Sequence, residues 1–209
     1  MISVKLNTLW SDETEKTIKG VNEATDDIKK YILKLHNRAN SLVLFSDVHE
    51  DIIEVCSFWT GKTYVGVQKD KDIEAAFQNF FEALMSMLLL IMNDTVKPLD
   101  CEKRFANAVL YRGTVYRYLG NDTPSNRIIK PQYNNIYVSW SKKPENTYLE
   151  SKLYGVKTRL YCDIKEPYFG IDLEQLGISK GNEKEVVFPT LEEFITNIEY
   201  ISEDNDDEA

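Results

Sequence analysis

The sequence predicts an α+β protein, in which a mainly helical first half is followed by a domain built around a β-sheet. Segments with apolar residues at helical spacing fill much of the first hundred residues, whereas short β-branched and aromatic segments separated by turn residues follow Pro98. Because no long helix separates these later segments, we expect a mixed or mostly antiparallel sheet.

This change in sequence character divides the chain into three parts. We expect a helical N-terminal lobe over residues 1–98, a β-rich core over residues 99–201 and a tail over residues 202–209. With 209 residues, 43% of them hydrophobic, the chain is long enough for a sizeable core. The tail, "SEDNDDEA", is dominated by acidic residues, so we expect it to be solvated and disordered.

Two segments of the first part are expected to be helices. In "EATDDIKKYILKLHNRA", the apolar residues Ile28, Ile32 and Leu35 recur at helical spacing. In "KDIEAAFQNFFEALMSMLLLIMND", the apolar faces are too wide for a surface helix, so we place this helix at the centre of the lobe. The opening "MISVKLNTLW" alternates as a strand does, and "SLVLFS" and "TYVGVQ" are expected to be short strands or buried loops.

Composition excludes several classes of protein. The most apolar run, Leu84 to Met92, falls far short of the roughly 20 residues that cross a membrane, and the start lacks the features of a signal peptide. Three scattered cysteines indicate reduced thiols, so we expect a cytoplasmic protein. With only two histidines, neither near a cysteine in sequence, no metal site is expected. "TGKT" resembles the end of a phosphate-binding loop, but Cys56 stands where that motif needs glycine.

Charge is distributed unevenly along the chain, whose net charge is −9. The stretch from Lys97 to Lys165 contains 13 Lys and Arg residues and 6 Asp and Glu residues, so it carries +7 and the remainder of the chain carries −16. The basic middle indicates either a mixed surface with a chance surplus or a groove for an anionic ligand, such as a phosphate-bearing cofactor or a nucleic acid.

Two motifs on predicted strands carry candidate functional residues. In "VLYRGTVYRYLG", Arg112 lies inside an apolar strand, where its guanidinium needs either a partner carboxylate or an anionic ligand. Gly113 has no Cβ, so the backbone there can approach a ligand, whereas the competing Arg117 lacks such a neighbour. In "YVSWSK", Ser139 and Ser141 share one face of a strand, and the residue between them faces the core.

The third motif, "GNEKEVVFP", has Glu183 and Glu185 one residue apart at the mouth of a predicted strand. In an extended chain the two carboxylates point to the same side. Taken alone, the pair fits a solvated loop. Glu185, however, directly precedes the apolar run Val186 to Phe188, and a carboxylate at the rim of a buried strand needs a donor.

In this order the motifs resemble the Arg-Ser-Glu class of mono-ADP-ribosyltransferases, which includes bacterial toxins, phage enzymes and animal ecto-enzymes. The family pattern is an aromatic-Arg-Gly strand, a Ser-X-Ser strand, and Glu-X-Glu followed by an apolar strand. The resemblance covers about half the chain, from Val109 to Ile201. Trp140 departs from the pattern, because the family usually has Thr or another small residue there. The matching positions are Arg112, Ser139, Ser141, Glu183 and Glu185.

The resemblance implies a split sheet around a cleft that holds NAD as substrate, without a metal. Arg112 would contact the NAD phosphates or adjoining ribose, and Gly113 would bind the nicotinamide amide through its backbone. Ser139 would position the nicotinamide ribose and Glu185, and Ser141 would join the NAD-binding set. Glu185 would accept from a ribose hydroxyl and stabilise the developing cation, while Glu183 would orient or deprotonate the nucleophile.

The resemblance also implies transfer of ADP-ribose to a macromolecular acceptor. Glu-X-Glu favours protein arginine, while basic residues in loops near the motif strands leave a nucleic-acid acceptor open; these are Arg127, Lys130, Lys142 and Lys143. The alternatives are an NAD glycohydrolase toxin and a catalytically inactive binding module with the same fold. A phage enzyme acting in its host and an effector of a toxin–antitoxin or phage-defence system fit equally, and in the latter an inhibitor protein would cover the cleft.

The segment "PTLEEFITNIEYIS" gives conflicting signals. Thr190 and Glu193 form a capping box, and apolar residues follow at helical spacing, which predicts a helix. Its β-branched and aromatic residues suit a strand, and the family has a final sheet strand here, which we expect beside the strand of Glu185. We therefore expect Pro189 to end one strand and residues from about Phe194 to Ile201 to form the next.

Overall fold

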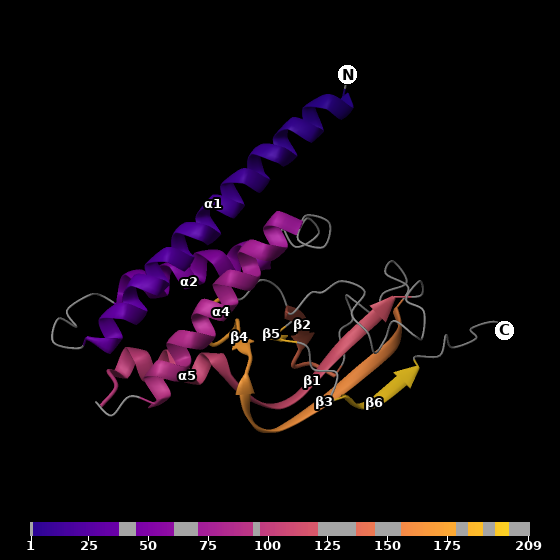
Figure 1. Cartoon of the computed structure of the whole chain (residues 1–209). Coiled ribbons are helices and arrows are strands. Elements are labelled where there is room, and N and C mark those ends of the chain that lie inside the picture. Colours follow the sequence, from indigo (N-terminus) through magenta and orange to yellow (C-terminus); the bar gives the residue numbers. More distant parts are fainter. Residues whose placement is uncertain are drawn as a thin grey trace. The chain divides into compact units, whose positions relative to one another are not determined.

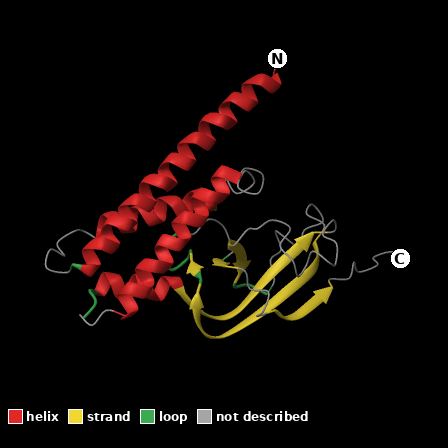
Figure 2. Ribbon diagram, viewed as in Figure 1, coloured by secondary structure: helices red, strands yellow, loops and turns green. Residues whose placement is uncertain are grey.

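The structure is a computed structural model that describes residues 2–37, 45–60, 71–93, 97–120, 137–144, 156–178, 184–189 and 195–200. Helices come first along the chain and strands follow (Figure 1; Figure 2), so the predicted α+β class is confirmed. The chain forms two compact units, Met1–Asn107 with Leu176–Ile178, and Ala108–Gln175 with Ser179–Ala209. The acidic segment 202–209 lies outside the described residues.

The helical unit contains α1 (Ile2–His36), α2 (Phe45–Trp59), α4 (Lys71–Asn93) and most of α5 (Asp100–Val109). Helix α1 packs along α4 and also contacts α2 (Figure 1). The strand predicted for the opening residues is wrong, because they form the first turns of α1. Ile2, Leu6 and Leu9 also satisfy helical spacing, and a short alternation does not separate the two periods. Of the two ambiguous segments, "SLVLFS" is described only at its last two residues, which open α2, and "TYVGVQ" lies outside the described residues.

Helix α4 supplies much of the core of the helical unit, as its wide apolar surface predicts. Phe77, Phe80 and Phe81 are buried, and the ring of Trp59 on α2 meets Phe77 and Phe81 edge to face at 5.2 and 5.4 Å. In the described part of the chain, α4 is also the one helix with the length and composition of a membrane span. Half of its most apolar stretch is buried inside the structure. Because core helices can have the same length and composition, these two properties alone do not establish a membrane span.

Helix α5 leads directly into the first strand, and a buried carboxylate holds its beginning. Glu102 is 2% exposed, and its Oε2 accepts from the Leu99 backbone N at 2.9 Å, in the manner of a capping residue. Its Oε1 accepts from the Tyr31 hydroxyl on α1 at 2.7 Å. The start of α5 is thereby joined to the rest of the helical unit.

The second unit is built on a six-stranded sheet in the order β4-β5-β2-β1-β3-β6. Its strands are β1 (Leu110–Gly120), β2 (Tyr137–Ser141), β3 (Val156–Phe169), β4 (Ile171–Asp172), β5 (Glu185–Pro189) and β6 (Ile195–Tyr200). Every described pairing is antiparallel. The sheet therefore agrees with the antiparallel form of the prediction.

The last segment is a strand and not a helix, as predicted, and β5 ends at Pro189. Its expected neighbour is wrong, however, because β6 pairs with β3 and not with the strand of Glu185. Both edges of β5 are already paired, one with β2 and the other with β4, which leaves β6 the second edge of the long strand β3.

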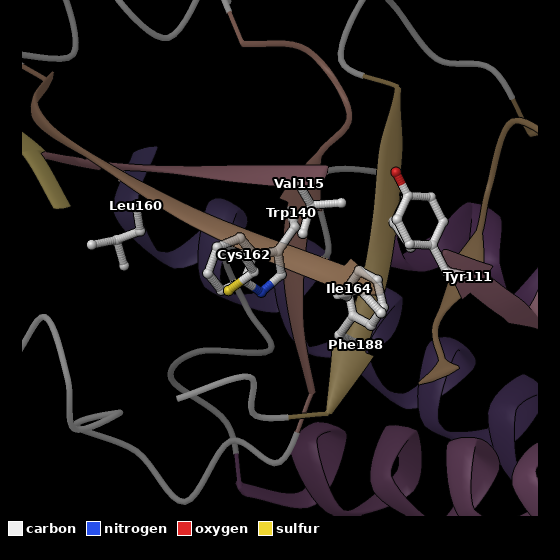
Figure 3. Close-up of a cluster of buried hydrophobic side chains, with 8 residues drawn as sticks. Tyr111, Val115, Trp140, Leu160, Cys162, Ile164 and Phe188 are labelled. Atoms are coloured by element: carbon white, nitrogen blue, oxygen red, sulfur yellow. The ribbon is translucent and has the colours of Figure 1, made fainter. Parts of the chain in front are cut away.

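One face of the sheet carries a continuous apolar cluster (Figure 3). It consists of Tyr111, Val115, Trp140, Leu160, Cys162, Ile164, Val186 and Phe188. The rings of Tyr111 and Phe188 meet edge to face at 5.4 Å, and Trp140 is buried among its neighbours as the strand alternation predicts. Because side chains alternate along each strand, the residues between these positions project from the opposite face. We call it the polar face, because Arg112, Thr114 and Asp163 are exposed there, although beside β2 and β5 it also carries the buried Val187 and Ile171.

We expect Gly170→Ala to lower the free energy of unfolding by about 1–3 kcal/mol through overpacking of this cluster. A Cβ on Gly170 would lie 2.1 Å from Cε1 of Phe188, whose ring is fully buried. Urea denaturation of both proteins measures the difference.

Gly20→Ala in α1 is the matched control, because its Cβ would meet the Phe58 ring at an ordinary 3.4 Å. We expect this variant to be as stable as the wild type or more stable by up to about 1 kcal/mol, since alanine favours helix. Equal stability of the Gly170→Ala variant and the wild type would contradict the packing described here.

Candidate active site

The sheet register places four of the motif residues on one face. Tyr116, Ser141 and Glu185 lie directly opposite one another across β1, β2 and β5. Residues that are opposite in antiparallel strands project from the same face, as do residues two or four apart in one strand. Ser139 and Arg112 therefore share the face of Glu185, and it is the face opposite the apolar cluster.

A hydrogen bond joins two of these residues directly. Ser139 donates from its hydroxyl to Oε1 of Glu185, from the diagonal position on β2. Ser141 is buried, and its hydroxyl oxygen accepts from the Lys143 backbone N at 3.0 Å. A hydrogen bond to a carboxylate is stronger than one between neutral groups, so Ser139 restricts the orientation of Glu185.

Arg112 is exposed, so the prediction of a costly guanidinium within an apolar strand is wrong. The reason is that β1 has one apolar and one polar face, and Arg112 projects from the polar one. Strand β2 lies between it and the strand of Glu185, and no described hydrogen bond or ion pair joins Arg112 to Ser139 or Glu185. The shared face alone relates Arg112 to the Ser139–Glu185 pair.

The backbone beside Arg112 has an unusual conformation. Gly113 has a φ of 134°, a value that residues with a Cβ rarely adopt. The Tyr111 hydroxyl donates to the Thr114 carbonyl at 3.2 Å and so spans this glycine, and the pairing of β1 with β3 is irregular at the same point. Glycine is therefore required here for the path of the backbone.

The structure does not add two further candidates from the sequence, Arg117 and Glu183, to this group of residues. Arg117 follows Tyr116 directly, so the alternation of β1 directs it away from the face of Glu185. Glu183 lies outside the described residues, and its expected place at the rim of the site stays a prediction. Glu185 itself is half-buried and is the first residue of β5.

Aromatic and cationic side chains from β1 and β3 extend this face, and the sequence reasoning did not identify them. The rings of Tyr116 and Tyr161 meet edge to face at 5.1 Å, and the Arg159 guanidinium carbon lies 5.2 Å from the Tyr161 ring centre and 5.9 Å from that of Tyr116. Arg159 also donates to the Pro144 carbonyl. Tyr116 lies four residues after Arg112 on the same strand, so strand alternation predicts that both side chains project from one face.

The described residues contain no metal centre, and the comparisons with known proteins find no match. Within the described ranges, no group of three or more His, Cys, Asp or Glu side chains could hold a metal ion, and a metal-free mechanism stays a prediction. Comparison of the chain with family models, curated proteins and solved structures gives no match. Any function must therefore be inferred from the residues themselves.

The thiol of Cys162 faces the apolar cluster, and burial raises its pKa to about 12. A raised pKa keeps the thiol neutral at pH 8, and the neutral form is a poor nucleophile. We expect iodoacetamide at pH 8 to label the half-buried Cys101 well before the buried Cys56 and Cys162.

Peptide mapping after timed labelling measures the three rates, and labelling in concentrated urea, where all three should react similarly, is the control. Rapid labelling of Cys162 in the folded protein would contradict its placement in the core.

Proposed function

We propose that this protein is an NAD-dependent mono-ADP-ribosyltransferase with a metal-free site on the polar face of its sheet. The observation that carries the proposal is the hydrogen-bonded pair of Ser139 and Glu185, which shares that face with Arg112. These are the three residue types of the Arg-Ser-Glu pattern. They lie on three different strands, β1, β2 and β5, which are neighbours in the sheet although they are far apart in sequence.

The chemistry requires a fixed anion beside the reacting sugar. When the bond between nicotinamide and ribose breaks, its electron pair leaves with nicotinamide and positive charge develops on the ribose. Glu185 stabilises this charge, with Oε1 held by Ser139, and would accept a hydrogen bond from a ribose hydroxyl. The exposed guanidinium of Arg112 supplies the cation for the phosphates.

The acceptor then attacks the ribose carbon and loses its proton, a step that we assign to Glu183. Protein arginine is the acceptor that the Glu-X-Glu pattern favours. Of the basic residues that left nucleic acid open as acceptor, Lys142 is less available to a phosphate, because its ammonium group is held by Asp172 and Glu174 at 2.9 and 2.7 Å. We propose a cytoplasmic location and a phage or toxin–antitoxin setting, in which an inhibitor protein would cover the site.

We expect the purified protein to release nicotinamide from NAD and Glu185→Gln to reduce this release at least about 100-fold, since removal of one electrostatic stabiliser costs that much elsewhere. Glu183→Gln should suppress transfer to the acceptor more than it suppresses NAD hydrolysis, because only Glu185 serves bond cleavage. Chromatography of nicotinamide and of ADP-ribose separates the two activities.

Glu23→Gln is the matched control, because Glu23 is an exposed carboxylate on α1 of the helical unit, and it should leave both activities unchanged. Absence of nicotinamide release with NAD and any cell lysate would refute the proposed enzyme and favour a binding module. Equal loss of both activities in the two glutamate variants would refute the separate roles.

The acceptor class can be tested with adenine-labelled NAD in a cell lysate. We expect the macromolecular label to be released by protease and to survive nuclease, because protein arginine is the proposed acceptor. Label that survives protease and is released by nuclease would instead establish a nucleic-acid acceptor. Free ADP-ribose as the sole product would identify an NAD glycohydrolase.

A further inference from the structure

An ion pair between the buried Asp172 and the half-buried Lys142 lies next to the strand of Glu185 and takes no part in the proposed chemistry. Asp172 on β4 is 2% exposed, and its two carboxylate oxygens lie 3.0 and 2.9 Å from Nζ of Lys142. The same carboxylate accepts from the backbone N of Glu174 and of Gln175, at 3.1 and 3.2 Å, and from the Gln175 side chain at 3.3 Å. A buried charge is retained at low cost only when it is paired in this way.

Asp172 lies on β4 and Lys142 directly follows β2, and these are the two strands that flank β5. Lys142 directly follows Ser141, the residue opposite Glu185, and its own backbone N donates to the Lys184 carbonyl at 3.0 Å. On the other side, the backbone N of Leu173, next to Asp172, donates to the Glu185 carbonyl at 3.1 Å. The ion pair therefore ties together the two segments that hold the backbone of Glu185.

The pair acts from the face opposite the reacting groups. Asp172 is directly opposite Val186, a member of the apolar cluster, so it projects from the core face, whereas Glu185 projects from the polar face. This geometry excludes contact between the Lys142–Asp172 pair and a substrate bound at Glu185. Its route to the reacting groups is the backbone on either side of Glu185.

The residue before Glu185 shows that this position is constrained. Lys184 has a φ of 46°, an unfavourable value for a residue with a Cβ, and such conformations persist where the surroundings enforce them. Glu174 contributes to this constraint, since it lies 2.7 Å from Nζ of Lys142 and 3.7 Å from Nζ of Lys184. Its hydrogen bond with Lys142 is the main reason that the pKa of Glu174 is lowered.

We infer that Lys142 and Asp172 are positioning residues, which hold Glu185 in its reactive orientation from the far face of the sheet. The inference rests on the proposed function, because it assigns Glu185 the role of stabilising the ribose cation. Without the ion pair, the ends of β2 and β4 separate more readily, and Glu185 moves relative to Ser139. A displacement of about 1 Å at a reacting group can reduce the rate about 100-fold.

The test uses Asp172→Asn and Lys142→Met, which remove the charges and keep similar side-chain sizes. We expect kcat for nicotinamide release to fall roughly 10- to 100-fold while KM for NAD changes less than about threefold, since the binding groups on the polar face remain. Lys142→Arg, which retains the cation, should recover much of the loss. The control is the exposed pair of Asp27 and Lys30 on α1, where Asp27→Asn and Lys30→Met should leave kcat unchanged.

A second measurement separates positioning from general loss of structure. In a Glu185→Asp background, the further substitution Asp172→Asn should lower kcat by less than about threefold, because the effect passes through Glu185. The same fold loss in both backgrounds, or an unchanged kcat in the single variants, would overturn the inference.

Hydrogen exchange keeps the test independent of activity. We expect the amides of Lys142 and Leu173 to exchange faster in Asp172→Asn, since they hold the backbone around Glu185. If the wild type releases no nicotinamide, the proposed function fails, and exchange alone decides whether the ion pair holds this backbone. Unchanged exchange at both amides would overturn the positioning role.

Discussion

The antiparallel pairing of β2 with β5 is the constraint on which the candidate site depends. It sets Ser141 opposite Glu185 and brings Ser139 within hydrogen-bonding distance of the carboxylate. A slip of one residue would send the side chain of Glu185 to the apolar face. The buried neighbours Trp140, Val186 and Phe188 prevent such a slip, because each would then lose its place in the core.

Trp140 shows how the core supports an unusual version of the serine strand. The resemblance has a small residue between the two serines, and this chain has its largest side chain type there. Trp140 projects into the apolar cluster, so its size does not alter the polar face (Figure 3). Its indole Nε1 is buried and has no hydrogen-bond partner among the described residues, so the packing of the ring must outweigh this unsatisfied group.

The two faces of the sheet have different roles in the proposed enzyme. The polar face holds the groups that would meet NAD, while the core face holds the ion pair and the apolar cluster that keep β5 in place. An ion pair on the core face can hold the backbone of Glu185 without contacting its carboxylate. A lysine on the polar face beside Glu185 would instead pair with that carboxylate and offset its charge. The separation therefore keeps the cation of the Lys142–Asp172 pair away from the Glu185 carboxylate.

The sequence alone determined the α+β class, the central helix α4 and the shared face of Ser139 and Ser141, because each depends on local periodicity. It determined the final strand β6 in another way, through its β-branched and aromatic residues and the family resemblance, against a local helical signal. Only the tertiary structure decided the features that depend on distant residues. It paired β6 with β3, exposed Arg112 on a polar face, and joined Lys142 to Asp172 across thirty positions of sequence. Alternation states that a strand has two faces; which face is buried, and which strand lies beside it, follows only when separate segments compete for the same edges and the same core.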